Sequence, residues 1–113
     1  MNKIKLVVNN EAKRNEREKF FIKQELQSIL NLYAKMVSNG SWKDYSFTSG
    51  IKEVSFDVYQ RASEKPVLRI LKNLKPRYFN EKYLFKDKNG AILKNSFDLN
   101  LLLKNTNWKK LQK

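Results

Sequence analysis

The sequence predicts an α+β fold, with one long N-terminal helix and a short C-terminal helix packed on one face of an antiparallel sheet of about four strands. Two observations support this prediction. Apolar residues recur every three or four positions up to Val37, and they alternate with polar residues in several later segments. A length of 113 residues gives room for one such core.

We expect a single α+β domain over residues 20–105. Residues 1–19 precede it as an N-terminal strand or flexible charged segment, and residues 106–113 follow it as a basic C-terminal tail.

The first predicted element is an amphipathic helix within residues 20–42. Its apolar stripe consists of Ile22, Leu26, Ile29, Leu30, Tyr33, Met36 and Val37. Asn39 and Gly40 supply a left-handed stop signal at its end. Such a helix is stable only when a sheet or another helix covers the stripe.

Strands are predicted at residues 42–47, 53–60 and 67–72. In the second of them, Val54, Phe56 and Val58 alternate with polar residues and are expected to face the helix. Tyr59 then lies on the opposite, solvated side of the sheet.

A hairpin is predicted over residues 83–95, because the sequence from Asp87 to Gly90 suits a tight turn. A three-residue loop would place Phe85 opposite Leu93 and Tyr83 opposite Asn95. After the hairpin, Ser96 is the predicted N-cap of a short helix to about residue 105. The core-facing residues of that helix are Leu99, Leu102 and Leu103.

The composition argues against several classes of function. The sequence contains no cysteine and no histidine, so thiol catalysis and the usual zinc, copper and haem ligands are missing. No apolar run approaches the roughly 20 residues of a membrane span, and no signal-peptide cleavage site follows the first lysines. We therefore expect a cytoplasmic, non-enzymatic protein with no metal, cofactor or catalytic residue. A metal-free enzyme is a further alternative.

The formal net charge of +13 indicates an anionic partner such as RNA or DNA. An AT-rich gene offers another explanation, because it would enrich lysine, asparagine and isoleucine without selection for binding. Both interpretations stay open at this point.

The candidate phosphate-binding residues surround the second and third predicted strands: Arg61, Lys65, Arg69, Lys72, Lys75 and Arg77. Tyr59 is a candidate for base stacking on the solvated sheet face. Trp108 either packs back on the domain or forms a surface contact. The ordinary alternative for this region is an internal ion pair of Glu64 with an arginine and a turn capped by Ser63.

A second functional hypothesis is a module that binds a protein partner or forms a homodimer. It would use the solvated sheet face or an edge strand, since unpaired backbone groups at a sheet edge can pair with another chain.

Two motifs are similar to those of a known family. They are Trp42-Lys43-Asp44-Tyr45 and Arg61-Ala62-Ser63-Glu64-Lys65-Pro66, and shorter matches extend from residue 20 to residue 104. The chain resembles the alphaproteobacterial family called domain of unknown function 2794. The resemblance implies a shared fold and an intracellular bacterial setting, and it transfers no catalytic residues.

Overall fold

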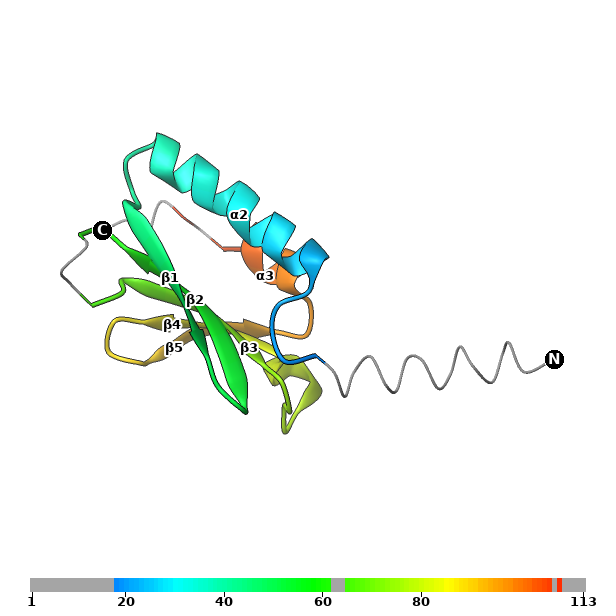
Figure 1. Cartoon of the computed structure of the whole chain (residues 1–113). Coiled ribbons are helices and arrows are strands. Elements are labelled where there is room, and N and C mark those ends of the chain that lie inside the picture. The colour runs from blue at the N-terminus through cyan, green and yellow to red at the C-terminus, as the bar shows by residue number, and fades with distance from the viewer. Residues whose placement is uncertain (1–17, 62–64, 107, 109–113) are drawn as a thin grey trace.

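A computed structural model shows two helices on the same side of a twisted sheet (Figure 1). The structure describes residues 18–61, 65–106 and 108. The elements in chain order are α2 (Lys23–Ser38), β1 (Asp44–Ser49), β2 (Glu53–Tyr59), β3 (Leu68–Asn73), the 3-10 helix η1 (Phe79–Glu81), β4 (Tyr83–Asp87), β5 (Ile92–Ser96) and α3 (Leu99–Lys104).

The sheet of the described residues is an antiparallel meander in the order β1-β2-β3-β4-β5. The predicted α+β class is therefore confirmed, with five strands in place of about four. The predicted N-terminal strand and most of the predicted basic tail lie outside the described residues.

The two ends of α2 follow from local hydrogen bonding. The Glu25 carboxylate accepts a hydrogen bond from the Ile22 N–H at 2.8 Å, which satisfies one of the amides that a helix start leaves unpaired. After Ser38 the chain turns through Gly40, whose φ of 84° suits a residue without a side chain. The predicted stop signal is confirmed.

The apolar stripe of α2 is wider than its contact with the sheet. Ile29 and Met36 are buried, whereas Ile22, Leu30 and Val37 each keep 39–41% of their surface exposed. The spacing thus predicted the helix, but it did not separate its buried residues from those at the rim.

The core lies between the helices and one face of the sheet. Val54, Phe56 and Val58 are buried there, as predicted. Trp108 also packs against this core: its ring meets the Trp42 ring edge-on, with centroids 5.7 Å apart. The structure therefore favours the packed alternative for Trp108 over a surface contact.

The hairpin of β4 and β5 forms, but the predicted register is wrong beyond its turn. The Asp87 N–H donates to the Ala91 carbonyl at 2.9 Å, as a three-residue loop requires. A bulge at Leu93 then shifts the pairing by one residue. The observed pairs are Lys86 with Ile92, Phe85 with Lys94, and Tyr83 with Ser96.

The predicted N-cap of the last helix is also wrong. Asp98 caps α3 by accepting a hydrogen bond from the Leu101 N–H at 3.2 Å. The Ser96 hydroxyl oxygen instead accepts from the Asp98 N–H at 3.1 Å, so it orders the turn before the helix. Leu99 and Leu102 face the core as expected.

A buried ion pair joins α2 to the middle of the sheet. Lys72 of β3 is only 1% exposed, and its ammonium lies 2.8 Å from Glu25 Oε1 and 2.6 Å from Glu18 Oε1. It also donates to the Phe20 carbonyl at 3.1 Å. The Tyr83 hydroxyl of β4 donates to the second oxygen of Glu25. One carboxylate thus connects the helix start to two neighbouring strands.

The same network holds Tyr83 in its protonated form. Burial, followed by the hydrogen bond to Glu25, raises the pKa of the Tyr83 hydroxyl well above its ordinary value of 10.0. The hydroxyl therefore remains a hydrogen-bond donor to the carboxylate even at alkaline pH, where an ordinary tyrosine ionises.

Replacing Lys72 with methionine should lower the free energy of unfolding by about 3–5 kcal/mol, because the Glu25 carboxylate would remain buried without its cation. The double variant Lys72→Met with Glu25→Gln removes the two most buried charges and should recover most of this loss, because the remaining Glu18 side chain is 18% exposed and can be hydrated. Urea denaturation measures both values. A single variant as stable as the unmodified chain would show that the ion pair does not secure α2 to the sheet.

Candidate nucleic-acid interface

The sheet face opposite α2 and α3 is covered by neither of these two helices (Figure 1), and the short helix η1 lies at one end of it. We call it the open face. Strand pairing places one row of side chains across its middle: Ser46, Asp57, Arg69, Lys86 and Ile92. A second row consists of Thr48, Ser55, Leu71, Leu84 and Asn95.

The Asp57 carboxylate is a buried, hydrogen-bonded group of the open face. It is 1% exposed and accepts hydrogen bonds from the hydroxyls of Thr48 at 2.6 Å and Ser55 at 2.7 Å. Arg69 Nε lies 3.3 Å from Asp57 Oδ1, although its N–H is not aligned for a hydrogen bond. The buried carboxylate thus attracts the Arg69 guanidinium electrostatically, while the arginine side chain is still 39% exposed.

Tyr59 lies on the open face, as predicted. Its hydroxyl is 3.0 Å from the Ser46 hydroxyl, which links β2 to β1, and the residue is half-buried. The Tyr59 ring is therefore only partly accessible to a ligand.

The expectation of a fully solvated face was wrong in its middle. Ser55, Leu71 and Leu84 are buried there together with Asp57. The loop formed by residues 74–82 is fixed at one end of this face, because the side-chain amides of two open-face asparagines donate to its backbone. Asn73 donates to the Glu81 carbonyl at 2.5 Å, and Asn95 donates to the Asn80 carbonyl at 2.9 Å.

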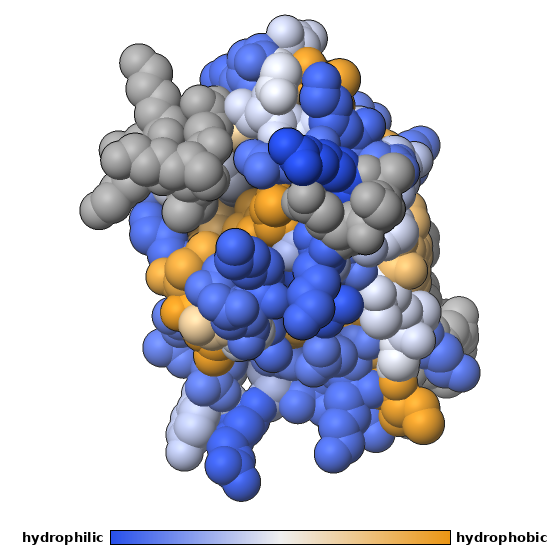
Figure 2. Space-filling view, turned by 90° about the vertical axis from the view of Figure 1, so that its left-hand side faces the viewer, coloured by the Kyte–Doolittle hydropathy of each residue, from blue (hydrophilic) through white to orange (hydrophobic). Residues whose placement is uncertain are grey.

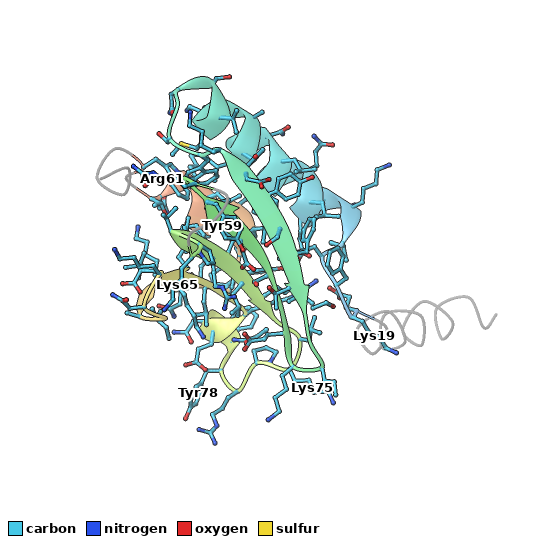
Figure 3. All side chains as sticks on the ribbon, turned by 60° about the vertical axis from the view of Figure 1, so that its left-hand side comes forward. Lys19, Tyr59, Arg61, Lys65, Lys75 and Tyr78 are labelled. Atoms are coloured by element: carbon cyan, nitrogen blue, oxygen red, sulfur yellow. The ribbon has the colours of Figure 1, made fainter. Side chains whose placement is uncertain are left out.

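The predicted cations do not form a single cluster. Figure 3 shows Arg61 and Tyr59 toward one end of the domain and Lys75 and Tyr78 toward the other, with Lys65 between them in that view. The six residues of β3 separate the segments that contain Lys65 and Lys75, which corresponds to roughly 17 Å of strand. Arg69 lies within β3, between the two ends.

Lys72 does not belong to this surface. Alternation along β3 turns it toward the helices, and Glu18 and Glu25 neutralise it there. Its selection as a phosphate contact is therefore corrected. The signal was present in the sequence, because Arg69 and Lys72 are three residues apart in one strand and must lie on opposite faces of the sheet.

Sequence reasoning missed Lys86. In the structure it lies directly opposite Arg69 across β3 and β4. The register between these two strands depends on the loop of residues 74–82, so no local pattern could have paired the two cations. The predicted Glu64 ion pair and Ser63 cap lie outside the described residues.

Residues that the structure describes line hollows near the ends of the sheet. A cleft of about 620 Å³ is lined by Glu18, Lys19, Ser49, Gly50, Ile51, Leu74 and Lys75. A smaller one of about 240 Å³ lies beside the start of α2 and includes Glu25 and Asp98 in its lining. Both carboxylates accept hydrogen bonds from the chain: Glu25 from the Lys72 ammonium and Asp98 from the Leu101 N–H.

Side chains of hydrophilic residues cover most of the side shown in Figure 2, and small hydrophobic areas lie between them. Within residues 18–61, 65–106 and 108, no helix is long and apolar enough to cross a membrane. The same residues contain no group of three or more acidic side chains that could hold a metal ion.

These features define a small helix-on-sheet domain with cations on the sheet face that α2 and α3 leave uncovered. The chain belongs to the family described as "Protein of unknown function (DUF2794)", whose profile matches residues 19–103. This match confirms the family suggested by the sequence motifs. Searches of curated proteins and of solved structures found no match.

Proposed function

We propose that this domain binds nucleic acid through the open face and the loop of residues 74–82, without catalysing a reaction. The observation that carries the proposal is the placement of Arg69 directly opposite Lys86. Two like charges at opposed positions destabilise a sheet. The buried Asp57 carboxylate on the other side of Arg69 compensates part of this repulsion, and a phosphate group near Arg69 and Lys86 would compensate the charge that remains.

The distribution of ion pairs also supports a polyanionic ligand. Several carboxylates accept hydrogen bonds from the chain itself: Glu18, Glu25, Asp44, Asp57, Asp87 and Asp98. In contrast, no described carboxylate lies within salt-bridge distance of Lys65, Lys75, Arg77 or Lys86. These cations would lose no internal partner on binding phosphate.

The size of the surface fits several phosphates. Cations near both ends of β3 are separated by roughly 17 Å of strand, and Arg69 and Lys86 lie between them. We further propose a cytoplasmic location, which the lack of cysteine in the sequence supports.

Reversing the charge of one loop cation and one open-face cation should weaken nucleic-acid binding more than reversing two cations on α2. The site variant carries Arg77→Glu and Lys86→Glu, and the control carries Lys23→Glu and Lys35→Glu on α2. Fluorescence anisotropy with labelled RNA and DNA across a salt series measures the affinity and its salt slope. The salt slope is that of log K against log[salt]. We expect its magnitude to fall by about two in the site variant, or about one for each lost phosphate contact, and to stay unchanged in the control.

Protein stability provides an internal check on this comparison. Lys86→Glu should raise the free energy of unfolding by roughly 0.2–1 kcal/mol, because it converts the opposed like charges into an opposite-charge pair with Arg69. Weaker binding by a more stable domain cannot be attributed to unfolding. Equal losses in the site and control variants would contradict a local phosphate-binding surface and favour generic attraction to the +13 charge.

A specific observation also favours the second hypothesis, a homodimer. The edge strand β1 has the sequence DYSFTS, which lacks the lysine or proline that commonly protects an edge. Tyr45 and Phe47 of this strand, together with Leu30 and Val37 of α2, are 39–41% exposed. Pairing of β1 with β1 of a second copy would cover these residues.

Sedimentation equilibrium over a range of protein and salt concentrations tests this hypothesis. A dimer should become tighter as salt rises, because salt screens the repulsion between two copies of charge +13. Replacing Leu30 and Val37 with lysine should return it to a monomer. A monomeric mass at every concentration and salt level would contradict the homodimer.

A further inference from the structure

Three aromatic side chains lie exposed near one end of the sheet. Tyr78 is 60% exposed, Phe79 is 75% exposed, and Phe97 is 47% exposed. The rings of Phe79 and Phe97 stack with centroids 5.0 Å apart and an angle of 17° between their planes. We call these three residues the aromatic platform. Exposed apolar groups that gather in this way commonly mark an interaction site.

The backbone of the platform is ordered by hydrogen bonds. The Glu81 N–H donates to the Tyr78 carbonyl at 3.0 Å and closes η1. The Asn80 carbonyl accepts from the Asn95 side chain of β5 at 2.9 Å. Because Phe79 uses one ring face against Phe97, its other face is available to a ligand in a prepared orientation.

Two cations precede Tyr78 and Phe79 in the loop of residues 74–82. The segment Lys75-Pro76-Arg77-Tyr78-Phe79 joins two positive side chains to two aromatic ones, and all five residues are exposed. Figure 3 shows Lys75 and Tyr78 extending from the same end of the domain. No described carboxylate lies within salt-bridge distance of Lys75 or Arg77.

We propose that the aromatic platform stacks unpaired bases, so that the ligand is single-stranded nucleic acid. This inference rests on the proposed function and makes it more specific. Exposed rings can stack on bases that have left a duplex, while nearby cations bind the connecting phosphates. In a duplex the faces of the bases are already stacked on one another, so the rings would have no comparable partner.

The test compares a labelled single strand with a duplex of the same length. Tyr78→Leu with Phe79→Leu removes both aromatic rings but keeps apolar side chains. The matched control, Tyr78→Phe with Phe79→Tyr, keeps both rings. Anisotropy titrations at fixed salt should show the leucine variant binding the single strand at least about fivefold more weakly, because stacking of each base contributes about 1–3 kcal/mol. Its duplex affinity should not change, and the control should match the unmodified chain.

The outcomes separate this inference from the proposed function. If the unmodified chain binds both ligands with a steep salt slope and the leucine variant loses nothing, or loses both ligands equally, the platform does not stack bases and single-strand selectivity is refuted. If the unmodified chain binds neither ligand at any salt concentration, the proposed function fails as well. The exposed rings would then be better explained as a contact for a protein partner.

Discussion

The contact between Lys72 and Glu25 determines how the layers of this domain meet. It places a positive charge from the central strand beneath the first turn of α2, where Glu25 also orders the helix start and accepts the Tyr83 hydroxyl. A buried charge that lost its partner would be strongly destabilising, so these groups must remain together for the fold to persist. The interaction therefore fixes the position of the helix over β3 and β4 as well as its starting residue.

That arrangement assigns different chemistry to the two faces of the sheet. The helices α2 and α3 and the apolar core occupy one face. On the other face, Asp57 is buried among hydroxyls and keeps Arg69 nearby, and Lys86 lies opposite that arginine. The same strand thus supplies one lysine that stabilises the fold and one arginine that remains accessible. A ligand can contact Arg69 without disturbing the ion pair of Lys72.

The parts of the structure that sequence predicted depend on local periodicity. Spacing identified α2, and alternation identified the core face of β2 through Val54, Phe56 and Val58. The errors arose from contacts between distant segments. Alternation within β3 places Lys72 on the face of Leu68 and Ile70, but its carboxylate partners lie about 50 residues earlier in the chain. The pairing of Phe85 depends on a bulge that no turn residue predicts. Lys86 and the stacked Phe79 and Phe97 became candidates only after the loop between β3 and β4 was placed.

In the function proposed for this domain, the ligand occupies the open face and the loop of residues 74–82. The most direct measurement is an NMR titration that follows the backbone amides of the isotopically labelled chain as a single-stranded oligonucleotide is added. We expect progressive shifts at Arg69, Lys86 and residues 75–79, with the amides on the exposed side of α2 unchanged. Shifts confined to α2 and α3, or spread evenly over all exposed lysines, would contradict it.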